Sequence, residues 1–87
     1  MNKQDIENWR KRLIFRSDHR GTKEMDIIMG KFARENVPHF TVDELGAYDE
    51  LLKENDPNLY NWIIDKEQPP ANIPLEMLNK IKATYIK

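Results

Sequence analysis

Apolar residues recur along this 87-residue chain at spacings of three and four positions, which is typical of amphipathic helices. The pattern predicts five helices, and no stretch alternates apolar and polar residues as a half-buried strand would. The first helix is expected over residues 4–16, and the second ends at about Glu35. We expect Ser17 or Asp18 to cap the second helix, Thr41 to cap the third, and Asp56, followed by Pro57, to cap the fourth. The fifth helix is expected to begin at Pro74.

Each predicted helix has one apolar face, which we expect to form the core. In chain order the faces are Ile6, Trp9 and Leu13; Met25, Ile28, Met29 and Phe32; Leu45, Tyr48, Leu51 and Leu52; Leu59, Tyr60, Trp62, Ile63 and Ile64; and Leu75, Leu78, Ile81 and Tyr85. Thr41 and Glu44 have the spacing of a capping box. Because the loops are only about 3–8 residues long, the chain is predicted to be all-α, a compact five-helix bundle forming a single domain over residues 1–87.

The composition excludes several kinds of active site. The chain has no cysteine, only two histidines, and three glycines that form no phosphate-binding cluster. We therefore predict no catalytic, cofactor-binding or metal-binding residues, and we expect a protein that is not an enzyme. Apolar runs are at most three residues long, so no direct membrane insertion is expected.

Charge is distributed unevenly along the chain. Residues 1–24 hold seven Lys/Arg against four Asp/Glu, a net of +3, and residues 25–87 hold seven against eleven, a net of −4. This asymmetry fits a basic first helix packed beside acidic later helices, and it equally fits a basic patch used for a partner. A small helical nucleic-acid binder would use Arg10, Lys11, Arg12, Arg16 and Arg20. The acidic remainder of the chain disfavours that alternative.

One segment does not have the pattern of core. If Arg20 lies in the second helix, Arg20 and Glu24 are one turn apart and point outward, away from the apolar face. They form either a routine surface ion pair or a partner contact. Gly21 indicates a special backbone angle or close approach by another surface. Ile27 continues this edge, and we expect either that the first or last helix covers it or that it is an apolar anchor within a charged rim.

Five stretches together carry a family resemblance. They are Arg12–Ser17 (RLIFRS), Arg20–Asp26 (RGTKEMD), Gly30–Phe32 (GKF), Tyr48–Leu52 (YDELL) and Asp56–Trp62 (DPNLYNW). Over about residues 9–64, in this order and spacing, the chain resembles the succinate dehydrogenase FAD assembly factor family, whose signatures are R-G-x-x-E and D-P-x-L-x-x-W.

The resemblance implies a chaperone-like assembly factor that promotes covalent attachment of FAD to the flavoprotein subunit of succinate dehydrogenase, and in some bacterial relatives also serves fumarate reductase. It implies a surface motif at Arg20, Gly21 and Glu24, to which we add Arg16 for electrostatic steering and Ile27 as expected partner-binding residues. The FAD belongs to the partner, and the chain itself is expected to bind no cofactor and no nucleic acid. We expect substitutions in the motif to leave folding nearly unchanged.

Mitochondrial members of the family carry a transit extension. This chain has almost nothing before its first predicted helix, so a bacterial cytoplasmic protein is expected. The alternatives to the assembly-factor function are a small helical nucleic-acid-binding protein and a generic adaptor.

Overall fold

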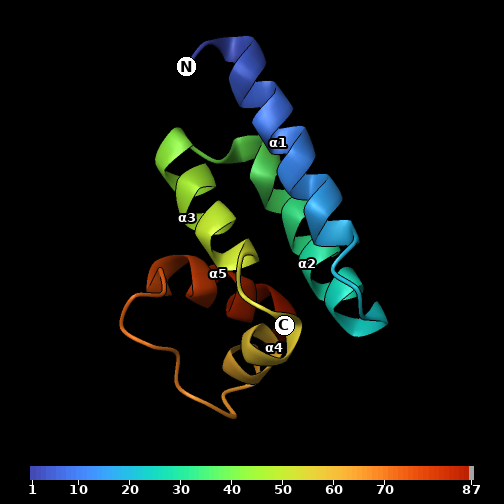
Figure 1. The fold of residues 1–87 in the computed structure, drawn as a ribbon, viewed down its shortest axis with the longest axis vertical. Coiled ribbons are helices and arrows are strands. Elements are labelled where there is room, and N and C mark those ends of the chain that lie inside the picture. Colours follow the sequence, from blue (N-terminus) through green and yellow to red (C-terminus); the bar gives the residue numbers. More distant parts are fainter. Residues whose placement is uncertain (87) are drawn as a thin grey trace.

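The computed structural model describes residues 1–86, with side chains through residue 85, and this part of the chain contains five α-helices and no strand (Figure 1). The helices are α1 (Lys3–Asp18), α2 (Lys23–Asn36), α3 (Val42–Leu52), α4 (Asp56–Ile63) and α5 (Leu75–Ile86), with a short 3-10 helix η1 (Val37–His39) between α2 and α3. The prediction of an all-α bundle of five helices is confirmed.

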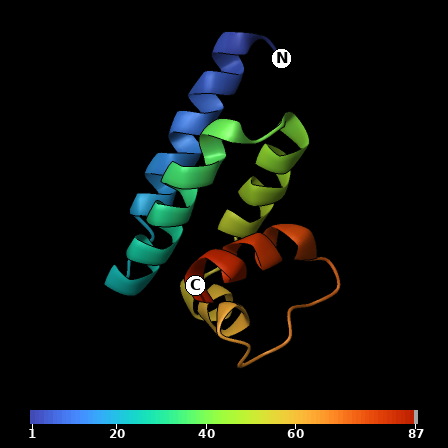
Figure 2. The same cartoon turned by 180° about the vertical axis from the view of Figure 1, so that it is seen from behind.

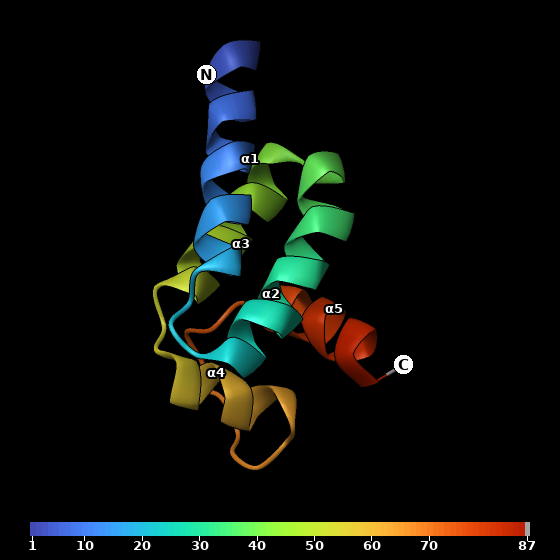
Figure 3. The same ribbon diagram turned by 90° about the vertical axis from the view of Figure 1, so that its right-hand side faces the viewer.

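The two longest helices form an antiparallel hairpin, and the other helices pack against it (Figure 1). η1 contains Pro38 and turns the chain from α2 into α3, which lies beside α1. α4 and α5 pack at the other end of α3, and α5 contacts α2, α3 and α4. Seen from behind, a long loop without helix joins α4 to α5 (Figure 2). The view from the side shows α4 close to the turn between α1 and α2 (Figure 3).

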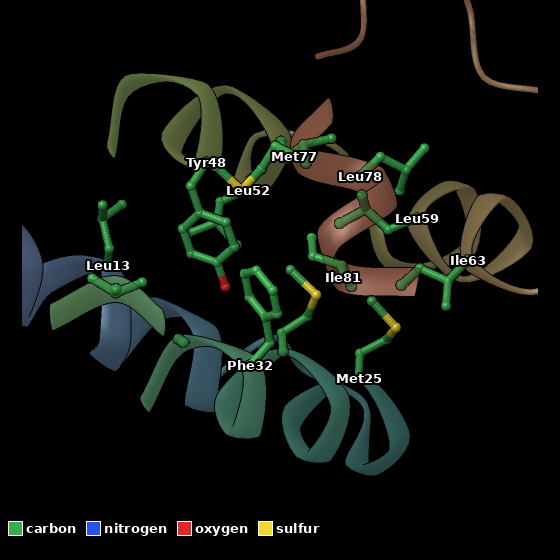
Figure 4. Close-up of a cluster of buried hydrophobic side chains, with 14 of the residues drawn as sticks. Leu13, Met25, Phe32, Tyr48, Leu52, Leu59, Ile63, Met77, Leu78 and Ile81 are labelled. Atoms are coloured by element: carbon green, nitrogen blue, oxygen red, sulfur yellow. The ribbon is translucent and has the colours of Figure 1, made fainter. Parts of the chain in front are cut away.

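The core is continuous across all five helices (Figure 4). Its largest fully buried side chain, Tyr48 of α3, lies 5.6 Å from Phe32 of α2 between ring centroids. The Tyr48 hydroxyl hydrogen-bonds the Ser17 hydroxyl at 2.6 Å, and Ser17 donates to the Leu13 carbonyl at 2.7 Å. Because Ser17 has a single proton, Tyr48 is the donor in their shared bond. Burial raises the pKa of Tyr48 to about 12.

The predicted apolar faces are confirmed in full for α3 and in part elsewhere. Ile6 and Trp9 of α1 are only half-buried, because they lie near the free end of the helix, and the Trp9 indole donates to Asp49 at 2.9 Å. In α5, Leu75 and Tyr85 are exposed and Met77 is buried in their place. The expected α5 face is confirmed at Leu78 and Ile81 and was wrong at both ends of the helix.

Two of the predicted helix starts were also wrong. Ser17 and Asp18 are the last residues of α1, and Thr22 is the N-cap of α2. Asn55, not Asp56, is the N-cap of α4 and accepts a hydrogen bond from the Asn58 amide at 2.9 Å. The capping box of Thr41 and Glu44 is present as expected. Within the described residues, no helix combines the length and apolarity needed to cross a bilayer.

Candidate partner-binding site

The segment from Arg20 to Thr22 is a tight turn and not the first turn of α2. The helix begins at Lys23, and the Thr22 hydroxyl accepts a hydrogen bond from the Met25 amide at 3.3 Å. The prediction that Arg20 and Glu24 share a helix face was therefore wrong, because helical spacing does not apply across the cap.

Gly21 explains why the helix cannot start earlier. Its φ is +116°, a backbone angle that residues with a side chain rarely adopt. A Cβ atom built at this position meets nothing within 4 Å, so the constraint comes from the backbone angle and not from crowding. Of the two interpretations of Gly21, the special backbone angle is confirmed.

The Arg20 side chain points into the protein, contrary to the prediction that it faces outward. Only 10% of it is exposed, and its guanidinium donates to three acceptors on α3, α4 and the loop between them. Nε donates to Oδ1 of Asp56 at 2.8 Å, and the two terminal nitrogens donate to the carbonyls of Leu52, at 2.6 Å, and of Glu54. Leu52 is the last residue of α3, where carbonyls lack intrahelical partners and a positive charge is favourable. Arg20 therefore joins the α1–α2 turn to the α3–α4 junction.

Two aspartates hold this turn, Asp26 through its backbone amides and Asp56 through its side chains. Oδ1 of Asp26, in the first turn of α2, accepts hydrogen bonds from the backbone amides of Arg20 and of Gly21, the latter at 3.2 Å. Asp56 accepts from Arg20 and, at 3.4 Å, from the hydroxyl of Thr22. Its charge is used for this pairing, which is why the neighbouring Asn55 serves as the cap of α4.

Three of the predicted contact residues do face solvent. Gly21 and Glu24 are exposed, and Ile27 has 58% of its surface exposed. The expectation that the first or last helix covers Ile27 was wrong, although α5 lies close to it. The exposure agrees with the other interpretation, an apolar residue within a charged rim.

Glu24 and Ile27 each line a surface hollow. Glu24 faces a hollow of about 210 Å³ between the start of α2 and α4, whose walls include Thr22, Pro57 and Tyr60. Ile27 faces a larger hollow of about 490 Å³ between α2 and α5, whose walls include Lys31, Ile81 and Tyr85. One exposed edge of α2 thus separates two depressions that a protruding partner side chain can enter.

Tyr60 is a residue of this surface that the sequence pattern did not single out. Tyr60 lines the same hollow as Glu24, and the Glu24 carboxylate, as the main cause, raises the pKa of the Tyr60 hydroxyl to about 12. Tyr60 had been assigned to the core face of α4, but it is only half-buried. We name the surface formed by Gly21, Glu24, Ile27 and Tyr60 the turn surface.

Arg16 is only partly available to a partner. It donates to Oδ1 of Asp49 on α3 at 2.9 Å, and 42% of its side chain is exposed. Burial raises the pKa of the Asp49 carboxyl, but the hydrogen bonds from Arg16 and Trp9 outweigh burial and lower the pKa below its ordinary value. Arg16 therefore holds α1 to α3 and retains part of its charge for solvent.

Comparison with known proteins gives consistent matches. The family model described as flavinator of succinate dehydrogenase matches residues 11–85. The chain is 34% identical to the FAD assembly factor SdhE of Legionella pneumophila (strain Lens), over 88% of this chain and 96% of that protein. It is 36% identical to the mitochondrial succinate dehydrogenase assembly factor 2 of Dictyostelium discoideum, over 90% of this chain. The chain spans only 55% of the length of the Dictyostelium protein and 39% of a similar Cryptococcus neoformans protein.

Proposed function

This chain belongs to the flavinator of succinate dehydrogenase family, and on that premise we propose that it promotes covalent attachment of FAD to the flavoprotein subunit of that enzyme. The observation that carries the proposal is the family match over residues 11–85, which includes both the turn surface and the residues that hold it in shape. The match to a Legionella FAD assembly factor supports a bacterial protein, and a cytoplasmic setting is part of the proposal. Fumarate reductase, a related flavoprotein enzyme, is included as a second client.

In this proposal the chain works by binding and not by catalysis. The flavin of the client supplies the redox chemistry of covalent attachment. The chain holds the client in the conformation that brings its flavin and the accepting residue together, and binds neither FAD nor nucleic acid itself. Moving such a conformation from 1% to 99% of the population requires about 5.5 kcal/mol of differential binding. An interface of roughly 1,000–1,600 Å² is large enough to supply that energy.

Each residue of the motif has a distinct role in the proposed contact. The exposed Glu24 carboxylate accepts charge-assisted hydrogen bonds from the client, and Ile27 provides an apolar anchor beside it. Gly21 gives the turn its shape and lets the client backbone approach closely. Arg20 is a positioning residue, because its guanidinium is committed to Leu52, Glu54 and Asp56. Arg16 adds positive charge for steering.

The proposal is tested by in-gel flavin fluorescence of the flavoprotein subunit, incubated with FAD and with each variant of this chain. Glu24→Arg should abolish the stimulation of flavin attachment while lowering the free energy of unfolding by only about 1 kcal/mol, because the Glu24 side chain is exposed and loses mainly its favourable charge in the first turn of α2. Glu76→Arg is the matched control, since Glu76 is exposed at the start of α5, away from the turn surface. Stimulation by folded Glu24→Arg at the wild-type level would show that the turn surface is not the contact.

A further inference from the structure

The outward face of the second half of α1 has a feature that the family motif does not use. Phe15 is 63% exposed, and among the large hydrophobic side chains of residues 1–85 only Met1 is more exposed. The same stretch of α1 faces the core through Leu13 and Ser17, which are fully buried. The Phe15 ring is therefore mostly unused for packing within the described part of the chain, and its contact with water is unfavourable.

The Phe15 ring is held in a defined position. It stacks on the His19 ring with centroids 4.1 Å apart and planes 20° from parallel. Nδ1 of His19 lies 2.8 Å from the Phe15 carbonyl, and because a carbonyl only accepts, this nitrogen carries the proton. The two rings form a small aromatic plate. Because their stacking already restricts the side-chain rotamers, little conformational entropy is lost when a partner binds.

Basic side chains surround this plate. Lys11 and Arg12 are exposed and make no ion pair with any described residue, and with Phe15 and Arg16 they line a shallow hollow of about 450 Å³. Residues 11–20 hold four Lys/Arg against one acidic residue, Asp18, a net of +3 in a chain whose net charge is −1. Asp18 is itself paired with Arg34 of α2. An apolar ring beside basic side chains that have no ion-pair partner among the described residues is complementary to a partner segment that carries acidic residues and one apolar side chain.

We infer that the face of α1 formed by Lys11, Arg12, Phe15 and His19 binds an acidic segment of the flavoprotein client that presents an apolar side chain to Phe15. The inference rests on the proposed function, and it adds a second contact region to the turn surface. The two regions are adjacent, since only Arg20 separates His19 from Gly21 in the chain. Nucleic acid fits less well, because the other residues of the chain carry a net charge of −4 and repel a polyanion.

The test measures binding of the purified chain to the flavoprotein subunit by calorimetry, at about 50 and 200 mM salt. The variants are Phe15→Ala and the pair Lys11→Glu with Arg12→Glu. Each should weaken binding about tenfold or more, and the charge reversal should also remove most of the salt dependence. The matched control is the pair Lys3→Glu with Lys66→Glu, which changes the net charge equally at two exposed lysines outside this face and should alter affinity less than about twofold.

Three outcomes would overturn the inference. If both α1 variants bind like the wild type while Glu24→Arg loses binding, the α1 face is not a contact but the proposed function stands. If the wild-type chain neither binds the flavoprotein subunit nor stimulates flavin attachment, the proposed function fails and this inference fails with it. If the wild type binds a DNA duplex or single-stranded RNA at about micromolar affinity and the charge reversal abolishes this, the face serves nucleic acid.

Discussion

Arg20 shows how a largely buried side chain can fix the shape of a surface to which its own charged group contributes little. Its guanidinium replaces water as the hydrogen-bond donor to two carbonyls and a carboxylate. The side chains of Arg20 and Asp56 are each only 10% exposed. Removing one member of such a pair leaves a charge and two acceptors without partners, which costs more than the pair contributes. A surface arginine in the position expected from helical spacing would cost almost nothing to remove.

Arg20→Ala should therefore lower the free energy of unfolding by about 3 kcal/mol, and this corrects the expectation that the substitution leaves folding unchanged. Arg16→Ala is the control, because its pair with Asp49 is more exposed and should cost less than about 1 kcal/mol. Urea unfolding of both variants measures the difference. Equal stability of the two variants would contradict the structural role of Arg20.

Gly21 is the second residue whose effect comes from the backbone. Gly21→Ala should cost about 1–3 kcal/mol, because alanine is strained at a φ of +116° even though its Cβ has space. Gly46→Ala is the control, since Gly46 is a helical glycine with equal space and an ordinary backbone angle, so alanine should be neutral or stabilising there. Thermal melting compares the two, and a stabilising Gly21→Ala would contradict the assigned angle.

At the scale of the element, helix ends decide where functional residues point. The start of α2 at Lys23 places Arg20 outside the helix, so its side chain reaches α4 while Glu24, inside the helix, faces solvent. The use of Asn55 as the cap of α4 leaves Asp56 available to Arg20. A shift of either start by one turn would separate the pair. The pair of Arg20 and Asp56 thus joins the R-G-x-x-E stretch of this chain to its D-P-x-L-x-x-W stretch.

The capping box of α3 offers a direct test of how much a helix start contributes. Thr41→Ala should lower the free energy of unfolding by about 1 kcal/mol, because the Glu44 amide loses its acceptor. Thr84→Ala removes an equivalent hydroxyl that only bonds back to the Lys80 carbonyl within α5, and it should cost less than about 0.5 kcal/mol. Denaturant titration of the two threonine variants distinguishes these values, and equal costs would mean that the box adds nothing.

At the scale of the whole molecule, the free energy of unfolding depends on pH, because groups that join the helices titrate at low and at high pH. At low pH the carboxyl of Asp49 is the relevant group, since its pKa is lowered by bonds from α1. A lowered pKa contributes stability above the ordinary value that is lost as the pH falls through the folded value. Protonation of Asp49 therefore loosens the attachment of α1 to α3.

At high pH the buried Tyr48 is one source of pH-dependent stability. Its pKa of about 12 in the folded state lies above the ordinary value of about 10, so the unfolded chain loses its proton first and stability falls as the pH rises from 10 to 12. A difference of about two pKa units corresponds to a loss of about 2–3 kcal/mol once the pH reaches or exceeds 12. Tyr48→Phe should remove much of this dependence, measured by urea unfolding at pH 8 and 11. Tyr60→Phe is the comparison at the half-buried tyrosine. A wild-type stability that does not change between these pH values would contradict the buried phenol.

The sequence alone determined the elements of this protein and its family, because helical periodicity and short motifs depend on neighbouring residues. It predicted five helices, most of the core, the capping box and the special backbone angle of Gly21. Only the tertiary structure decided the direction of the Arg20 side chain, the exposure of Ile27 and which residues at the ends of α5 are buried. These depend on partners far along the chain, as in the pair of Arg20 and Asp56, 36 residues apart. Spacing within a helix cannot specify such a contact, because it arises only when separate helices pack together.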